Sequence, residues 1–497
     1  MRIAIVASEA VPFSKTGGLA DVAGTLFKEY LKMGLDAYLF APLYRRTEEK
    51  FADEIRDTGL VLDIPLGRAV RKCRVFTLRA QKTDKNSLTS GFRLPASGRV
   101  FFIGNDDFFG RGELYGTPRG DYPDNDQRFT FFCKSVLEIC VRLDLKVDVM
   151  QCNDWQTGLI PLYLKTLYKG VPALGTAVSV FTIHNLGYQG LFPPQTMAIT
   201  GLSVDIFNPE GIEFYGKVNF LKAGIIGADI ITTVSTTYAK EILTPEFGFG
   251  LDGILRKRAD SVVGILNGID YAEWDPLTDA FIPRNYHSAD LPGKAACKRA
   301  LAERCSLERG MAAPLMCFIG RLSAQKGIDI LAEIIPGLIT GGANVIVIGR
   351  GDEHYHTVLG SLRTRFRKYF FFCTEFDEAF AHLAYAGSDM FLMPSRYEPC
   401  GLGQMIAMRY GTIPVARRTG GISDTVEDGA TGFLFDEYSA ASFMMSVKRT
   451  LGAYVNGKTW QTLVENALLR DFSWERSAKA YVKIYGDVLR AKTGAAA

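Results

Sequence analysis

Short apolar runs alternate with longer segments of helical periodicity along nearly the whole chain. The first run covers residues 3–7, and a polar loop leads from it to residues 19–33, where apolar side chains recur at helical spacing. Residues 37–40 form the next apolar run. A short continuous apolar run predicts a buried strand, and the order strand, helix, strand predicts a βαβ unit with parallel strands. The chain therefore begins as a parallel α/β sheet.

The same alternation continues through the first half of the chain. A hairpin is expected at 63–77, and further strands are expected at 99–103, 147–152, 177–183, 230–234 and 262–266. Helices are expected at 129–141 and 217–227.

The pattern restarts after a loop-rich connector, residues 271–293, which holds three prolines. In the second half we expect strands at 315–319, 344–348, 369–373, 390–393, 413–416 and 433–435. A helix is expected at 328–339, and an amphipathic helix at 473–492 ends the pattern. Strands that alternate with helices in both halves predict two Rossmann-like domains, at 1–268 and 269–474.

Composition narrows the class of protein. The 497 residues are 47% hydrophobic and 22% charged, which is ordinary for a globular enzyme, and a net charge of +3 favours neither nucleic acid nor a membrane surface as partner. Nine widely spaced cysteines without a C-x-x-C pair predict free thiols in a reducing compartment. No apolar stretch reaches the length of a membrane span, and no signal segment precedes the first strand. We expect a cytoplasmic enzyme.

Residues 389–408, D-M-F-L-M-P-S-R-Y-E-P-C-G-L-G-Q-M-I-A-M, place a carboxylate and a glycine-rich turn between a strand and a helix. Glu398 is the carboxylate, and Gly401 and Gly403 belong to the turn. Ligands of open α/β sheets bind at the carboxyl ends of the strands, and the free amides of a helix start favour phosphate. A carboxylate beside a phosphate site suits a sugar nucleotide.

Three other groups follow predicted strands and reach the same kind of edge. They are Lys15 with Gly17 and Gly18, His184, and Arg321 with Lys326. Each also has a purely structural interpretation: tight packing for the glycine pair, a core position for the histidine, a solvated helix start for the cations and an N-cap for Glu398. Because parallel strands share one carboxyl edge, these groups could converge if the two domains face each other.

Two further patterns allow a chemical interpretation and a structural one. Asp124-Asn125-Asp126 could hold a divalent metal with a diphosphate, but as an N-cap cluster for the helix at 129–141 it needs no ligand, and we favour capping. Cys400 stands at a helix start, where a thiol pKa can fall. No histidine is near it in sequence, so we interpret it as a small residue of the turn.

Transfer of a sugar from a nucleotide requires cations for the leaving diphosphate and an anion near the anomeric carbon. Arg321 offers a bidentate fork and Lys326 a point charge, while Glu398 could supply the anion. The sequence shows no second carboxylate suited to double displacement.

Six motifs then carry a family resemblance. They are K-T-G-G-L-A-D-V (15–22), T-I-H-N-L-G-Y-Q-G (182–190), G-I-L-N-G-I-D (264–270), I-G-R-L-S-A-Q-K-G (319–327), P-S-R-Y-E-P-C-G-L (394–402) and R-R-T-G-G-I-S-D-T-V (417–426). In this order, and over the whole chain, they resemble the bacterial glycogen synthases and the plant starch synthases. The resemblance implies a GT-B fold: two Rossmann-like domains with a deep cleft, and a final helix, within 475–497, that crosses back to the first domain.

The resemblance also implies a reaction. It is transfer of glucose from ADP-glucose to the non-reducing end of an α-1,4-glucan such as glycogen, with retention of configuration and with no metal or other cofactor. The leaving phosphate itself would take the acceptor's proton. The residues matched to the family's motifs are Lys15, Gly17, Gly18, Asn267, Cys400, Gly401, Leu402 and Gly403 for the donor, Asp21 for the acceptor side, and His184, Arg321, Lys326 and Glu398 for catalysis.

The chain departs from the family's pattern at three positions. Asn153 stands where a histidine is usual, Gly403 where threonine is common, and Gly187 where several relatives have alanine. We expect the first two to alter substrate contacts by removing a histidine contact and a hydroxyl. Rival interpretations are a sugar-nucleotide epimerase on the same fold and a catalytically silent glucan-binding homologue. Glycogen phosphorylase is disfavoured because its motifs are absent.

Overall fold

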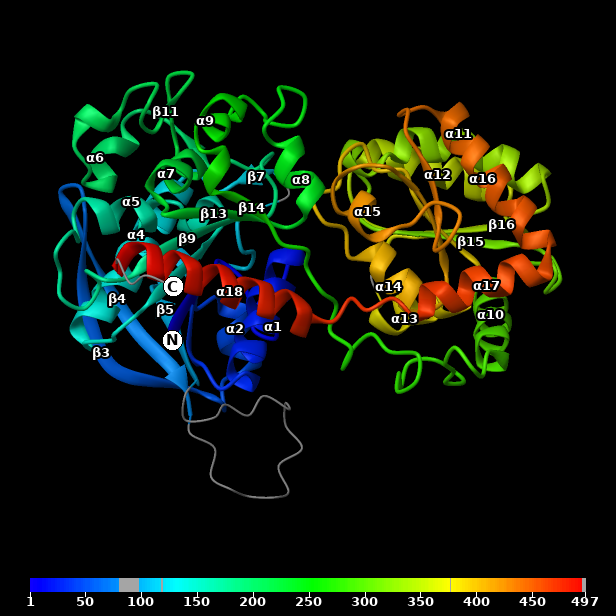
Figure 1. The fold of residues 1–497 in the computed structure, drawn as a ribbon, viewed down its shortest axis with the longest axis horizontal. Helices are drawn as coiled ribbons and strands as arrows, with labels where there is room; N and C mark the ends of the chain where they lie inside the picture. The colour runs from blue at the N-terminus through cyan, green and yellow to red at the C-terminus, as the bar shows by residue number, and fades with distance from the viewer. Residues whose placement is uncertain (80–97, 118, 376, 494–497) are drawn as a thin grey trace. The chain divides into compact units, whose positions relative to one another are not determined.

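The computed structural model describes residues 1–79, 98–117, 119–375 and 377–493, and it divides into two compact units (Figure 1). The first unit comprises Met1–Val234, Ala239–Ile265 and the chain from Trp474 onward. The second comprises Ser235–Tyr238 and Leu266–Ser473. Residues 494–497, the end of the segment predicted to cross back, lie outside the described residues.

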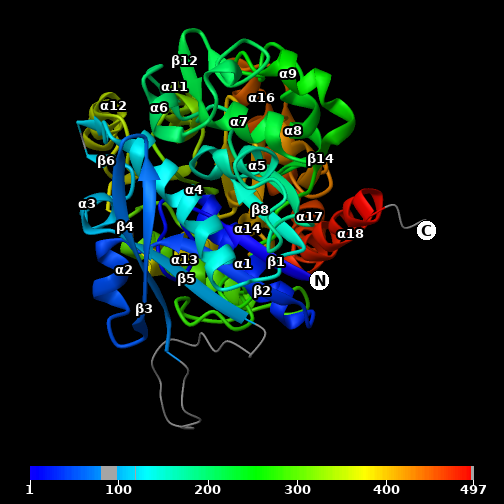
Figure 2. The ribbon, with the colours of Figure 1, turned by 90° about the vertical axis from the view of Figure 1, so that its left-hand side faces the viewer.

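The first unit is built on a nine-stranded sheet with β1 near its centre. In spatial order its strands are β14 (Val262–Gly264), β13 (Ile230–Thr233), β9 (Val178–Ile183), β8 (Val149–Asn153), β1 (Arg2–Val6), β2 (Asp36–Pro42), β5 (Gly98–Gly104), β4 (Ala69–Leu78) and β3 (Ile55–Leu66). The strands from β14 to β5 pair in parallel, and β3 and β4 add an antiparallel hairpin at one edge (Figure 2). The hairpin is longer than predicted.

Helices cover this sheet and bury its apolar strands. They are α1 (Gly18–Lys32), α2 (Arg45–Lys50), α3 (Asp106–Phe109), α4 (Asn125–Arg142), α5 (Leu159–Lys165), α6 (Thr196–Thr200), α7 (Phe220–Gly227), α9 (Asp252–Lys257) and α18 (Trp474–Thr493). A further helix, α8 (Thr236–Glu241), begins in residues of the second unit. In β1 the four residues from Ile3 to Val6 are fully buried, which is the pattern that a strand between two helical layers requires.

The C-terminal helix belongs to the core of the first unit. Trp474, Tyr481 and Tyr485 of α18 are buried in the same apolar cluster as Leu26 and Tyr30 of α1. Figure 1 shows α18, in red, lying against the blue N-terminal elements. The helix predicted at 473–492 is therefore present, and it packs on the first unit.

The second unit holds a six-stranded sheet in which all neighbouring strands pair in parallel. In order its strands are β17 (Phe370–Cys373), β16 (Asn344–Ile348), β15 (Leu315–Ile319), β18 (Met390–Met393), β19 (Ile413–Arg417) and β20 (Phe433–Phe435). Its helices are α10 (Pro292–Arg304), α11 (Ile328–Thr340), α12 (Glu353–Arg365), α13 (Glu378–Gly387), α14 (Gly403–Arg409), α15 (Gly420–Thr425), α16 (Ala440–Val455) and α17 (Gly457–Leu468).

The structure corrects the start of one predicted helix. Lys217–Asn219 form β12, which pairs with β10 (Leu191–Phe192) and β11 (Glu213–Phe214), and the helix begins only at Phe220. The side chain of Asn219 accepts a hydrogen bond from the Lys222 amide at 2.8 Å, so it caps α7 at this point.

The cluster at 124–126 lies at the start of a helix as predicted, but Asp124 does not cap that helix with its side chain. Asp124 occupies the N-cap position of α4, but its side chain makes no capping hydrogen bond. Instead, Arg111 binds its two carboxylate oxygens with both guanidinium nitrogens, at 2.7 and 2.5 Å. A bidentate arginine pair is a stronger interaction for a carboxylate than one helix amide.

None of the helices among the described residues is long and apolar enough to cross a lipid bilayer. All nine cysteines are unpaired and eight of them are buried, as the spacing predicted.

Candidate active site

Glu398 lies in the loop between β18 and α14, at the carboxyl edge of the second sheet. The residue is only 5% exposed. Its Oε2 accepts hydrogen bonds from Lys326 Nζ at 2.5 Å and from Ser395 Oγ at 2.9 Å. The N-cap of α14 is Leu402, so Glu398 is not the capping residue. The structure thus brings two of the predicted catalytic residues together.

Lys326 reaches Glu398 because the loop after β15 packs onto the end of β18. Gly327 has a φ of +72°, and a Cβ there would lie 2.0 Å from the carbonyl oxygen of Pro394. The Arg396 amide donates to the Gln325 carbonyl at 2.8 Å, which joins the same two loops. Arg321 belongs to this loop and is exposed. Only glycine at 327 permits this approach.

A glycine pair supports the Glu398 turn from the other side. The Gly421 amide donates to the Glu398 carbonyl at 3.1 Å. A Cβ on Gly420 would lie 1.9 Å from that carbonyl oxygen, and one on Gly421 would lie 2.1 Å from the Cys400 oxygen. The motif that holds these glycines contributed to the family resemblance, but neither glycine was among the predicted site residues. Glycines at a predicted helix start after a strand are the signal that marks it.

Aromatic side chains fill the space beside Gly403, the position where threonine is common in the family. A Cβ at this position would lie 2.9 Å from the Phe391 ring and 3.3 Å from the Tyr385 hydroxyl. Phe391 is 1% exposed, and its ring centroid lies 5.4 Å from that of Tyr385. The aromatic pair therefore fills the space that a larger residue would need.

Cys400 and Asn267 meet beside this turn. Burial raises the pKa of the Cys400 thiol to about 12, although the Asn267 backbone amide donates to its sulfur. The thiol stays protonated at neutral pH, which agrees with its interpretation as a turn residue rather than a nucleophile. Asn267 is 6% exposed, and its Oδ1 has no hydrogen-bond partner among the described residues.

In the first unit, the loop from Lys15 to Gly18 leads into α1. Lys15 Nζ lies 2.7 Å from Asp21 Oδ1. Gly17 is the N-cap of α1 in extended conformation, without a side-chain cap, and Gly18 is the first helical residue. The structure therefore pairs the predicted donor-side lysine with the predicted acceptor-side aspartate.

Glu9 holds this loop, and the sequence analysis missed it. Its carboxylate accepts hydrogen bonds from the Thr16 amide and, at 2.9 Å, from the Thr16 hydroxyl. Burial raises the pKa of Glu9 to about 7, because only these hydrogen bonds and one from the Gly17 amide offset the loss of water. Glu9 lies shortly after β1, and that placement at a strand end could have identified it.

His184 follows β9, and its ring contacts Asn153 at the end of β8. The distance from His184 Nε2 to Asn153 Oδ1 is 2.9 Å. Asn153 Nδ2 donates to the Val6 carbonyl at 3.0 Å, and this bond fixes which end of the amide faces the histidine. Asn153 therefore binds His184, and the expected loss of a substrate contact at this position stays a prediction.

Burial lowers the pKa of His184 to about 3. The imidazole is therefore neutral near pH 7. A neutral ring whose Nε2 faces an amide oxygen carries its proton on Nε2 and leaves Nδ1 as an acceptor.

Asp154 is a second residue that the sequence analysis missed. It has a φ of 56° and a ψ of −176°, a region that non-glycine residues rarely occupy. Its carboxylate accepts from the His184 amide at 2.8 Å and also from the Asn185 amide, and burial raises its pKa to about 7. The strained backbone thus places a carboxylate under the His184 loop.

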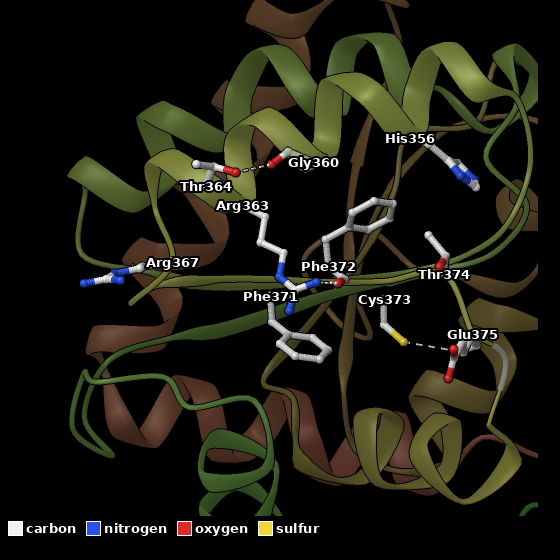
Figure 3. A pocket seen from close by; sticks show the side chains of 10 residues that line it. All are labelled: His356, Gly360, Arg363, Thr364, Arg367, Phe371, Phe372, Cys373, Thr374 and Glu375. Carbon is white, nitrogen blue, oxygen red and sulfur yellow. Dashed lines mark hydrogen bonds between the residues drawn. The ribbon is translucent and has the colours of Figure 1, made fainter.

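The second unit also has a surface pocket of about 930 Å³ between α12 and β17 (Figure 3). Arg363, Arg367 and Phe371 line it, and Arg363 Nη1 donates to the Phe372 carbonyl at 3.2 Å. None of the predicted site residues lines this pocket, so its position supports none of their assignments.

Comparison with known proteins identifies the family of this chain. The starch synthase catalytic domain matches residues 2–257, and the group 1 glycosyl transferases match residues 313–452. The glycogen synthase of Thermodesulfovibrio yellowstonii is 47% identical over 490 residues, which cover 98% of this chain and 97% of that protein. The chain belongs to the glycogen synthase and starch synthase family.

Other members of the family extend the likeness to structure. Glycogen synthase 2 of Geobacter metallireducens is 43% identical and covers 98% of both chains. The catalytic domain of starch synthase IV from Arabidopsis thaliana, bound to ADP and acarbose, superposes with a TM-score of 0.87 at 31% identity, covering 98% of this chain and 99% of that one. The predicted GT-B fold is confirmed, and the chain is a hexosyltransferase.

Proposed function

We propose that this hexosyltransferase elongates glycogen by transferring glucose from ADP-glucose to the non-reducing end of an α-1,4-glucan, with retention and release of ADP. The observation that supports it most directly is the buried Glu398 held by Lys326 at a sheet edge that suits phosphate. The likeness to a starch synthase bound to ADP and acarbose supports the donor and acceptor classes.

In the second unit, Arg321 and Lys326 would neutralise the diphosphate, and the backbone of Cys400, Gly401, Leu402 and Gly403 would lie beside it. Glu398 would hold the glucose and stabilise the positive charge that develops at its anomeric carbon. The unpartnered Oδ1 of Asn267 would accept a hydrogen bond from a glucose hydroxyl.

In the first unit, Lys15, Gly17 and Gly18 would contact the donor, and Asp21 would serve the acceptor side. His184 would contact glucose as a neutral imidazole, consistent with the fall in its pKa.

The leaving phosphate would take the proton of the acceptor hydroxyl, so that no separate base is required. The pairing of Glu398 with Lys326 fits this proposal, because one ammonium can be shared between the carboxylate and an arriving phosphate. The family resemblance implies neither a metal nor another cofactor for this step.

The decisive experiment measures turnover with ADP-glucose and with UDP-glucose, each with and without glycogen. We expect ADP release that depends on glycogen and a faster reaction with ADP-glucose. Conversion of the donor to an isomer without glycogen would favour an epimerase, and no turnover with either donor would favour a silent homologue.

Variants of the Glu398–Lys326 pair test the assignment of residues. Glu398→Ala should lower kcat by about 10²- to 10³-fold with a modest change in donor KM, because it removes an interaction made chiefly in the transition state. Lys326→Ala should chiefly raise the donor KM, and the two effects should not add, since the residues are in contact. Glu437→Ala, at an exposed turn of the same unit, is the control. Near-normal turnover of Glu398→Ala would contradict the catalytic role.

A further inference from the structure

Glu273, Glu378 and His382 form a cluster outside the proposed active-site residues. Glu273 lies in the connector before α10, and Glu378 and His382 lie one turn apart on α13. One ligand atom from each residue lies within 4.8 Å of the others. Glu378 is exposed and the histidine is buried.

Aromatic and polar neighbours hold the ring of His382 in place. It stacks on Trp274 with the ring centroids 4.0 Å apart, and Phe281 packs 4.8 Å from it. His382 Nδ1 lies 2.8 Å from Asp279 Oδ2, and Asp279 also accepts a hydrogen bond from the Tyr410 hydroxyl. The carboxylate can accept but not donate, so His382 Nδ1 carries a proton.

The other ring nitrogen is left without a partner. His382 is 0% exposed, and its Nε2 has no hydrogen-bond partner among the described residues. With the proton on Nδ1, a neutral ring keeps a lone pair on Nε2. A histidine that donates one nitrogen to a carboxylate and offers the other is the arrangement typical of metal ligands.

We propose that Glu273, Glu378 and His382 bind a divalent cation, with the ion at Nε2 and between the two carboxylates. One imidazole and two carboxylates form a ligand set that Zn²⁺ accepts, with water completing the coordination. The ion would join the connector to the first turn of α13 and would have no part in glucose transfer. It would also relieve the repulsion between two neighbouring carboxylates.

A single proton is the rival occupant. A second proton on the ring would make an imidazolium whose Nε2–H donates to a glutamate, without any metal. A metal ion and a proton can be distinguished by experiment. A bound metal ion remains with the protein through dialysis and raises its Tm, whereas a proton leaves no metal to detect.

The test uses the full-length chain, stripped with a chelator and titrated with Zn²⁺ alone. We expect one ion per chain by equilibrium dialysis with elemental analysis, and a higher Tm on binding. The double variant Glu273→Gln with Glu378→Gln should lose the ion, because glutamine keeps the size of each side chain but removes the carboxylates.

The matched control is Glu353→Gln with Glu437→Gln. Glu353 is an exposed acid in the first turn of α12, as Glu378 is in α13, and Glu437, like Glu273, is an acid in a loop outside the helices. This control should bind Zn²⁺ like the native chain. The absorption spectrum with Co²⁺ should show nitrogen and oxygen ligands and no thiolate charge-transfer band.

Asp279→Asn tests the outer partner of the histidine, with its fold checked by circular dichroism. Loss of the carboxylate should weaken Zn²⁺ binding by about 10- to 100-fold. The proposal is overturned if the native chain binds no stoichiometric ion, if the Co²⁺ spectrum shows thiolate ligation, or if the Glu273→Gln, Glu378→Gln variant binds Zn²⁺ as tightly as the native chain.

Discussion

At the residue scale, two of the three departures from the family's pattern, Gly403 and Asn153, are each matched by a neighbour in this chain. The space beside Gly403 holds the Phe391 ring, and the amide of Asn153 binds the ring of His184. Neither departure leaves a gap, so each substitution should be tested together with the neighbour that accompanies it.

Gly403→Thr should destabilise the chain by about 1–3 kcal/mol, because the new side chain meets a well-packed ring. Phe391→Leu should recover much of this loss in the double variant. The control is Gly457→Thr, since Gly457 is also the first residue of a helix but has nothing within 4 Å of its Cβ position. Urea unfolding gives the free energy of unfolding of the native chain, of Gly403→Thr, of the double variant and of the control. A Gly403→Thr variant as stable as the native chain would show that Phe391 moves aside freely.

Asn153→Ala removes the acceptor that orients His184. We expect kcat/KM with ADP-glucose to fall by about tenfold, which corresponds to one hydrogen bond of about 1.4 kcal/mol. Asn153→His should restore part of the activity by giving the ring another partner. Activity is measured well below the Tm of each variant, so that a loss of turnover is distinguished from unfolding. Full activity in the alanine variant would show that the amide does not orient the ring.

At the scale of elements, the site residues lie on loops that follow strands, and each loop is held by a residue within it or in a neighbouring loop. The loop of Lys15 is held by Glu9, the loop of His184 by Asp154, and the turn of Glu398 by Gly420 and Gly421. These partners orient the loops, and they explain why buried carboxylates stand at the strand ends.

Glu9 should make stability depend on pH. Burial raises its pKa from 4.5 to about 7 in the folded chain. The folded state therefore binds the Glu9 proton more tightly than the unfolded state does. The contribution of protonated Glu9 to the free energy of unfolding is complete below about pH 4.5 and is lost as the pH rises through about 7. Glu9→Gln keeps a neutral acceptor and avoids this loss.

Relative to the native chain, Glu9→Gln should gain stability between about pH 5 and about pH 8, by at most about 3 kcal/mol. Urea unfolding at both pH values gives the difference, and Glu48→Gln, at an exposed position on α2, is the control. A difference that is the same at both pH values would mean that Glu9 does not titrate in this range.

The sequence predicted most strands and helices because buried strands such as β1 and β18 are continuous apolar runs. It failed at Lys217–Asn219, where a three-residue strand is too short to show a period. It also found the chemical groups at the strand ends. It missed the contact of Asn153 with His184, since this contact depends on which strands are neighbours. It also missed Glu9, because no pattern of apolar positions marks a carboxylate that binds Thr16 within its own loop.

The contacts of Asn153 could not be predicted because β8 lies between β9 and β1 in the sheet. Asn153 touches Val6, which is 147 positions away, and His184, which is 31 positions away. No local pattern records such pairings, and only the assembled sheet does.

At the scale of the whole molecule, the first unit is completed by the last helix of the described chain. The Tyr485 hydroxyl donates to Gln151 Oε1 at 2.8 Å and lies 3.0 Å from the Tyr30 hydroxyl. This buried polar network joins α18 to α1 and β8, and it fixes how α18 lies on them.

Tyr485→Phe should destabilise the first unit by about 1–3 kcal/mol, because Gln151 loses its nearest donor in a buried place. Tyr30→Phe should cost less when added to Tyr485→Phe than it does alone, since both hydroxyls belong to one network. Tyr215→Phe, at a position 84% exposed, is the control. Thermal unfolding followed by circular dichroism measures these changes, and additive effects would contradict the network.

The return of α18 to the first unit also has a consequence for synthesis on the ribosome. The first unit leaves the ribosome early, but Trp474, Tyr481 and Tyr485 of its core come only after the 208 residues from 266 to 473. At about 5–20 residues per second, that delay is roughly 10–40 s. During this time the apolar surface of α1 that packs against α18 remains uncovered, while the second unit can already fold. The part of the chain that is made first is therefore the last to be finished, and the nascent chain should need protection from aggregation mainly there.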